Sequence, residues 1–174
     1  MKDLITSAFP RSGSTYLNQA LQLLYYPTEA VNLNRHSVIA IENAQKIMVP
    51  FRNPKDSIAS WHKYPSNGFL EADIKFYVRF YSFVLGNLSK VVLMDFDNFT
   101  QDIEYIKSKV FDNYNLTTDK VVTNDEVKMA MLVNGKEINL PRNNKEELDL
   151  IKSTLESMPE FTECIDLYAR LKQI

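Results

Sequence analysis

The stretch Phe9-Pro-Arg-Ser-Gly-Ser-Thr-Tyr16 follows an apolar run from Leu4 to Phe9 and opens an amphipathic stretch from Thr15 to Leu24. This order predicts a strand, a tight polar turn and a helix. Gly13 can adopt backbone angles that other residues avoid, so successive N–H groups of the turn can face inward beside the positive end of the helix. A phosphate or sulfate group fits such a turn.

The cation of this turn is Arg11. The turn lacks the G-x-x-x-x-G-K-S/T spacing of nucleoside triphosphatases, which place a lysine on the terminal phosphates and a hydroxyl on magnesium. A guanidinium group binds two oxygens of a tetrahedral anion at once, and Ser12, Ser14 and Thr15 add hydroxyl groups beside it. An ordinary strand-to-helix turn is the alternative for this segment taken alone.

A second segment, Phe51-Arg-Asn-Pro-Lys-Asp-Ser-Ile-Ala-Ser-Trp61, also follows an apolar run and opens a helix. Three of its residues suit an N-cap, a first helical position and a first-turn acid, namely Asn53, Pro54 and Asp56. Arg52 therefore precedes a helix start, and Ser60 falls on the helix face nearest to it. The alternative is a well-capped surface helix with Ser60 in solvent.

Together the two segments resemble the cofactor-binding pair of sulfotransferases that use 3′-phosphoadenosine 5′-phosphosulfate (PAPS). In that family a P-[KR]-S-G-T-T-x loop binds the 5′-phosphosulfate, and an R-N-P-x-D-x-x-x-S segment binds the 3′-phosphate. Here they read Pro10-Arg-Ser-Gly-Ser-Thr-Tyr16 and Arg52-Asn-Pro-Lys-Asp-Ser-Ile-Ala-Ser60. The second match is the more specific one, because its arginine-to-serine spacing agrees.

The resemblance implies an enzyme that transfers the sulfuryl group of PAPS to a hydroxyl or amine of an acceptor and releases 3′-phosphoadenosine 5′-phosphate (PAP). It also implies a role for each matching position. The 5′ end would be bound by Arg11, Ser12, Gly13, Ser14 and Thr15, the 3′-phosphate by Arg52 and Ser60, and Tyr16 stands where many members have a tryptophan against the adenine.

Sulfuryl transfer needs an in-line acceptor, positive charge on the leaving oxygens and a base, and it requires no bound magnesium. His36, between the two motifs, corresponds to the catalytic histidine of the family and can accept the proton. Glu29 is the alternative base, because other branches place a glutamate after the first helix. A third possibility is that His36 is an ordinary loop histidine.

Alternating apolar and amphipathic stretches predict an α/β fold with a central, mainly parallel sheet flanked by helices. The resemblance implies that this fold is three-layered and P-loop-like. Strands are predicted at residues 3–9, 46–51 and 90–96. Helices are predicted at residues 14–25, 54–63, 69–87, 98–112, 143–157 and 160–172. Both anion-binding segments then follow the carboxyl ends of strands, where ligands of such sheets bind. Pro50 cannot donate a ladder hydrogen bond and is expected to mark the end of its strand.

The 174 residues, 45% hydrophobic and 24% charged, suit one globular domain over residues 1–174. A net charge of −2 argues against a nucleic-acid groove and favours local positive charge at Arg11 and Arg52. We expect no membrane span and no signal peptide, and hence a cytoplasmic protein. Cys164 has no second cysteine to pair with and is expected in the core, and no metal site is expected.

The chain departs from the family pattern in ways that leave the acceptor and the oligomeric state open. The C-terminal R-K-G loop of many members has only Asn134-Gly135-Lys136 and Arg142 as candidate remnants, and Phe96-Asp97-Asn98-Phe99 is a loose version of the family's Y-E-D-L turn. Aromatic residues of the helix predicted at 69–87 suit core packing better than an acceptor pocket.

Two other functions are compatible with the sequence. A P-loop small-molecule kinase would share the fold and an anion loop, but it predicts a lysine in that loop, which is absent here. A non-catalytic nucleotide-binding relative of the sulfotransferases would keep Arg11 and Arg52 without an effective base.

Overall fold

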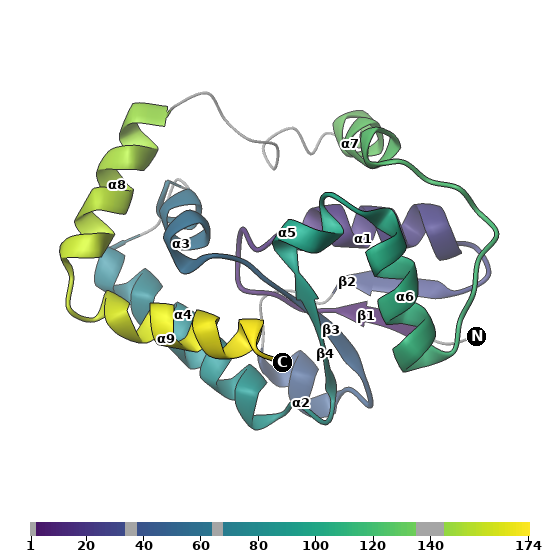
Figure 1. The fold of residues 1–174 in the computed structure, drawn as a ribbon, viewed down its shortest axis with the longest axis horizontal. Coiled ribbons are helices and arrows are strands. Elements are labelled where there is room, and N and C mark those ends of the chain that lie inside the picture. The colour runs from purple at the N-terminus through teal and green to yellow at the C-terminus, as the bar shows by residue number, and fades with distance from the viewer. Residues whose placement is uncertain (1–2, 34–37, 64–67, 135–144) are drawn as a thin grey trace.

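Four parallel strands form the centre of the molecule in the computed structural model, in the order β2-β1-β3-β4 (Figure 1). The structure describes residues 3–33, 38–63, 68–134 and 145–174. The strands are β1 (Asp3–Thr6), β2 (Ala30–Leu33), β3 (Ile47–Phe51) and β4 (Val91–Asp95). The helices are α1 (Ser14–Tyr25), α2 (Val38–Asn43), α3 (Pro54–His62), α4 (Leu70–Gly86), α5 (Phe96–Phe99), α6 (Ile103–Tyr114), α7 (Asn124–Val133), α8 (Lys145–Ser157) and α9 (Phe161–Lys172).

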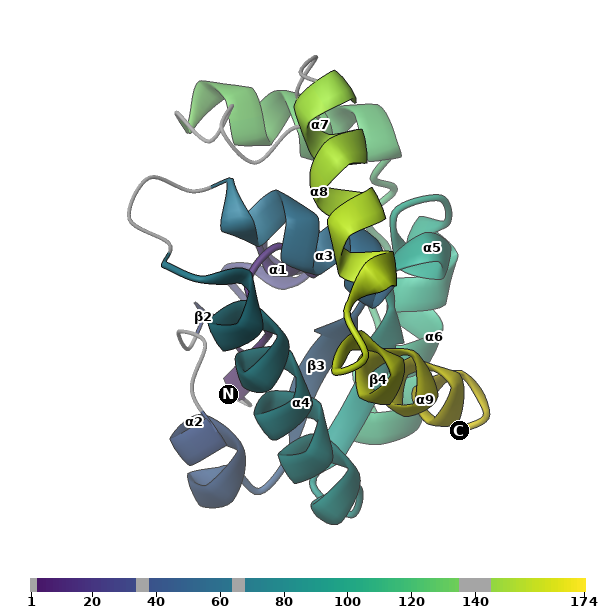
Figure 2. The same ribbon diagram turned by 90° about the vertical axis from the view of Figure 1, so that its left-hand side faces the viewer.

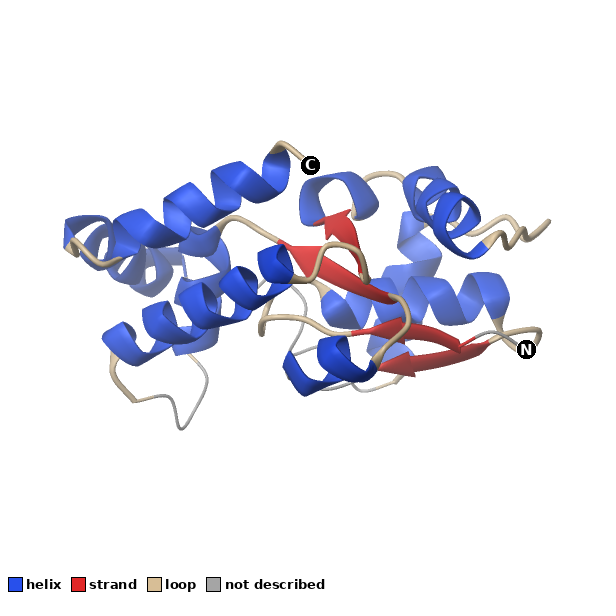
Figure 3. Ribbon diagram, turned by 90° about the horizontal axis from the view of Figure 1, so that it is seen from below, coloured by secondary structure: helices blue, strands red, loops and turns tan. Residues whose placement is uncertain are grey.

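Helices cover both faces of the sheet, which confirms the predicted α/β class. Successive strand residues point to opposite faces. In β3, Ile47 and Val49 pack into one apolar cluster and Met48 packs into the other. The first cluster includes residues of α2, α3, α4, α8 and α9, and the second includes residues of α1, α5, α6 and α7. Figures 1 and 2 show where these helices lie relative to the sheet. Figure 3 shows the strands with helices around them, and burial on both faces explains their continuous apolar sequences.

The strand order contains one topological switch point, between β1 and β3. The chain passes from β1 to β2 on one side and then crosses to β3 and β4 on the other. The pairing of β1 with β3 is short, with Thr6 opposite Met48 and a hydrogen bond of 3.0 Å from the Ser7 N–H to the Met48 carbonyl. Beyond this point the two segments separate. Ligands of open α/β sheets bind outside the carboxyl ends of strands at such a point.

Pro50 lies inside β3, opposite Met94 of β4, and the strand continues to Phe51. The Met48 carbonyl points toward β1, and Pro50, two residues later, faces the same side. Because β1 has already left the sheet there, the missing N–H of the proline interrupts no ladder bond. The expectation that Pro50 ends its strand is therefore wrong.

The three predicted strands and most predicted helices are present, with shorter ends, but several elements were not predicted. These are β2, α2 and α7. The start of α7 carries a capping box between Thr123 and Glu126, a signal that the sequence does contain. The helix predicted at 98–112 is in fact α5 and α6, because Asp102 accepts a hydrogen bond from the Glu104 N–H and begins a new helix.

Aromatic residues of α4 form core, as their spacing predicts. Tyr77, Phe80 and Tyr81 are fully buried. Cys164 is also buried, and burial raises the pKa of its thiol to about 12, which suits packing rather than nucleophilic chemistry. None of the helices within the described ranges is long and apolar enough to cross a bilayer.

Candidate functional site

The loop after β1 and the segment after β3 meet at the switch point. The loop contains two residues with left-handed backbone, Arg11 with φ of 64° and Gly13 with φ of 91°. Between them, the Ser12 N–H donates to the Phe9 carbonyl at 3.3 Å, which closes the turn. Left-handed backbone is costly for a residue with a side chain, so Arg11 is held in this conformation by its surroundings.

Gly13 is required at the start of α1 for steric reasons as well. A Cβ atom at this position would lie 2.6 Å from Cδ2 of Phe96 and 2.8 Å from Cζ of Phe99. The glycine therefore lets the loop lie directly on the aromatic corner that follows β4. The Leu17 N–H already bonds to the Gly13 carbonyl, so the N–H groups of the first helical turn precede the regular ladder and point toward the loop.

The two predicted anion-binding segments contact each other through Arg11. Its Nε donates to the Ser60 hydroxyl at 2.9 Å, across 49 residues of sequence. Nη1 of Arg52 donates to the Arg11 carbonyl at 3.3 Å. The structure thus brings together Arg11, Arg52 and Ser60, as their assignment to one ligand requires.

Arg52 lies on the ring of Phe96, with its guanidinium carbon 4.3 Å from the ring centroid. This cation–π contact restrains the guanidinium group. Nη1 already donates to the Arg11 carbonyl, and the fork carries further N–H donors with which it can bind an anion. Burial lowers the pKa of Arg52 below its usual value, while the negative charges of Asp56 and Asp97 oppose that effect. The group remains a cation that has already lost part of its hydration.

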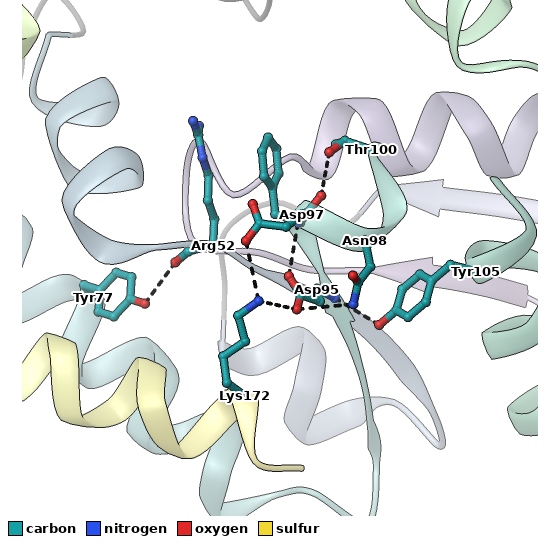
Figure 4. Close-up of polar contacts among 9 residues, drawn as sticks. Arg52, Tyr77, Asp95, Asp97, Asn98, Thr100, Tyr105 and Lys172 are labelled. Carbon is teal, nitrogen blue, oxygen red and sulfur yellow. Dashed lines mark hydrogen bonds and ion pairs between the residues drawn. The ribbon is translucent and has the colours of Figure 1, made fainter. Parts of the chain in front are cut away.

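The corner that carries Phe96 is attached to the end of the last helix. Lys172 of α9 is 2.5 Å from a carboxylate oxygen of Asp95 and 3.5 Å from one of Asp97 (Figure 4). The Asp95 carboxylate also accepts from the Asp97 N–H, which caps the short helix α5. The ammonium group therefore neutralises part of the acidic charge near Arg52.

Ser12 is an inward-facing anchor rather than a direct ligand. Its side chain is fully buried and its hydroxyl lies 3.0 Å from the Tyr81 hydroxyl. Tyr81 donates its only proton to the Pro50 carbonyl at 3.0 Å, so Ser12 must be the donor to Tyr81. Its N–H is used by Phe9. Ser12 therefore has no donor left for an anion, and its predicted direct role is corrected to one of holding the loop.

The other loop residues differ in position. Ser14 is buried and Thr15 half-buried in the first turn of α1. Tyr16 is buried, its hydroxyl donates to the Asn124 side chain at 2.7 Å, and burial raises its pKa to about 12. The centroid of its ring lies 6.0 Å from the centroid of the Phe99 ring. A role for Tyr16 against adenine stays a prediction.

The two candidate bases are not placed beside the loop. Glu29 immediately precedes β2, whose first residue Ala30 pairs with Asp3 at the amino end of β1. The loop lies at the carboxyl end of β1, so Glu29 is at the opposite end of the strands. The structure separates it from Arg11, and we do not retain it as the base. His36 lies outside the described residues, and its role stays a prediction.

Sequence reasoning did not identify the residues that support the site. Phe96 belongs only to a loose turn motif, and neither motif segment points to Tyr77, Tyr81 or Lys172. The Tyr77 hydroxyl donates to the Arg52 carbonyl at 3.2 Å (Figure 4). Two tyrosines four residues apart on a core helix lie on the same face, and a buried hydroxyl needs a hydrogen-bond partner. The sequence therefore indicates that both hydroxyls bond to a neighbouring segment.

No protein-family model matches the chain, and comparisons with curated proteins and with solved structures gave no match. The resemblance to sulfotransferases therefore rests on the two motifs alone. Among the residues that the structure describes, no group of three or more histidine, cysteine or acidic side chains is arranged to hold a metal ion.

The substitution Gly13→Ala should destabilise the protein by at least about 2 kcal/mol, because it places an alanine at positive φ and drives Cβ into two aromatic rings. Gly86→Ala is the matched control. Gly86 is the last residue of α4, and apart from its chain neighbours and the backbone of its own helix nothing lies within 4 Å of an added Cβ. This variant should therefore be more stable to unfolding by about 0.4–1 kcal/mol. Urea denaturation measures both, and equal midpoints for the two variants would contradict the tight seat of the loop.

Proposed function

We propose that the protein is a PAPS-dependent sulfotransferase. The observation that carries the proposal is the hydrogen bond from Arg11 to Ser60, because it joins the two motif segments at the switch point of the sheet. In this proposal the turn of Arg11 and the start of α1 hold the 5′-phosphosulfate. Arg52 and Ser60 hold the 3′-phosphate.

The described contacts suit a nucleotide with two separate anionic groups, one at its 3′ end and one at its 5′ end. Arg52 is restrained by its contact with the Phe96 ring, so binding an anion costs little further ordering. The Ser60 hydroxyl accepts from Arg11 and keeps its own proton to donate to a phosphate oxygen. The positive end of α1 adds to the field of both guanidinium groups.

PAPS, when bound, supplies the sulfuryl group that is transferred. Arg11 would stabilise the negative charge that grows on the leaving phosphate as the bond to sulfur breaks. The acceptor hydroxyl or amine must lose a proton as it attacks, and His36 is the residue we assign to accept it.

A nucleotide-binding protein without transferase activity is the second candidate. The observation in its favour is that Glu29 lies at the amino end of the strands, away from the loop of Arg11. His36 is then the one remaining candidate for the base. Binding experiments test the property that both candidates share, and transfer experiments separate them.

The first test concerns Arg52. PAP should bind more tightly than AMP or ADP, and Arg52→Ala should remove most of that difference, because a charged hydrogen bond to the 3′-phosphate contributes about 1.5–3 kcal/mol. Arg79→Ala, at an exposed arginine of α4, is the control and should bind PAP as the unaltered protein does. Isothermal titration calorimetry measures the affinities. Equal binding of all three nucleotides to the unaltered protein would exclude this function.

The second test concerns Arg11. If its charge acts mainly on the leaving oxygen, Arg11→Ala should slow single-turnover transfer by at least about a hundredfold while weakening PAP binding much less. Arg11→Lys should retain part of the rate, because a cation remains. Transfer of labelled sulfate from PAPS to a panel of phenol, sugar and peptide-tyrosine acceptors measures the rate. An undiminished rate in Arg11→Ala would show that the loop has no catalytic role.

The third test concerns the base. His36→Ala should lower the transfer rate by at least about a hundredfold with PAP affinity retained, and the rate of the unaltered enzyme should fall in acid as the imidazole is protonated. Glu29→Gln should leave the transfer rate nearly unchanged, because this carboxylate lies at the end of the strands opposite the loop of Arg11. The same transfer assay reads both. A silent His36→Ala in an active enzyme would remove the assignment.

A further inference from the structure

The hydroxyl of Tyr81 lies where the backbone ladder between β1 and β3 stops. The last ladder bond runs from Ser7 to Met48. Past it, Tyr81 donates to the Pro50 carbonyl and accepts from the Ser12 hydroxyl, both at 3.0 Å. A side chain of α4 thus replaces the missing main-chain bonds and connects the end of β3 to the loop of Arg11.

The position of this hydroxyl is tightly constrained. Both Tyr81 and Ser12 have 0% of their surface exposed, so bulk water has no direct access to replace either bond. The Tyr81 ring is packed among aromatic neighbours, with centroid distances of 4.5 Å to Tyr77 and 5.1 Å to Phe80. One turn earlier on α4, Tyr77 donates to the Arg52 carbonyl. Helix α4 therefore holds the end of β3 at two carbonyls and the loop at one hydroxyl.

We propose that Tyr81 is a positioning residue of the nucleotide site, which sets the distance between the loop of Arg11 and the strand end that carries Arg52. This inference rests on the proposed function, because it concerns a ligand that both segments bind at once. Removing the hydroxyl leaves the Ser12 hydroxyl and the Pro50 carbonyl buried without this partner. The loop then relaxes away from β3, and the two arginines lose their alignment.

The first measurement needs no ligand. Amide hydrogen exchange of residues 11–16 should become about fivefold faster or more in Tyr81→Phe and, to a similar extent, in Ser12→Ala. Tyr25→Phe is the matched control, because Tyr25 is 1% exposed and its hydroxyl has no hydrogen-bond partner among the described residues. Loop exchange in that variant should not change. Unchanged loop exchange in Tyr81→Phe would overturn the proposal.

The second measurement compares two ligands by calorimetry. Tyr81→Phe should weaken PAP binding by about fivefold or more and AMP binding clearly less, since only PAP spans both segments and depends on their alignment. Adding Ser12→Ala to Tyr81→Phe should cause little further loss, because the two residues act through one hydrogen bond. Equal losses for PAP and AMP, or an unchanged PAP affinity, would overturn the positioning role.

The two measurements separate this proposal from the proposed function. If the unaltered protein fails to bind PAP, the sulfotransferase assignment falls, and the exchange experiment alone decides whether Tyr81 holds the loop. If the unaltered protein binds PAP and Tyr81→Phe loses no affinity for it, the nucleotide site stands and the positioning role of Tyr81 falls.

Discussion

The close contact between Gly13 and the aromatic corner after β4 is the constraint on which the site depends. A Cβ atom at position 13 would come within 3 Å of Phe96 and Phe99. Because glycine has no Cβ atom, the backbone of the loop can lie directly on these rings. The ring of Phe96 contacts both the loop and the guanidinium of Arg52. One aromatic side chain thereby connects segments that follow β1, β3 and β4.

Helix α4 holds the segments of the site in place. Its aromatic residues Tyr77 and Tyr81 are buried in the core, and their hydroxyl groups face the site. Tyr77 and Tyr81 direct their hydroxyls at two carbonyls near the end of β3, and Tyr81 also accepts from Ser12. Buried hydroxyls without partners would be costly, so these contacts specify one relative position of helix, strand and loop. Pro50 fits this arrangement, because its carbonyl is used by a side chain and its ring needs no strand partner.

The electrostatics of the site depend on the ion pairs near Arg52 and on the burial of Arg52 itself. The chain has a net charge of −2, and acidic groups near the site are partly neutralised by Lys172 from the end of α9. Hydrogen bonding and the charge of Asp95 raise the pKa of Lys172 above its usual value against the opposing effect of burial. Arg52 is partly desolvated, which strengthens its attraction to an anion that replaces its lost water.

The sequence by itself determined the class of fold, the strands that precede the two motif segments and a turn at Gly13 that suits glycine, because hydrophobic periodicity and turn chemistry are local properties. The close contact of Gly13 with Phe96 and Phe99 became visible only in the tertiary structure. The sequence also indicated that Arg11, Arg52 and Ser60 belong together, through motif spacing. Only the tertiary structure decided that Ser12 faces inward, that Glu29 lies at the opposite end of the strands, and that Phe96 and Tyr81 hold the segments in place. These outcomes depend on strand order and on contacts between residues far apart in the chain. The spacing of Tyr77 and Tyr81 indicates that their hydroxyls need partners, but no local pattern says which partners they have.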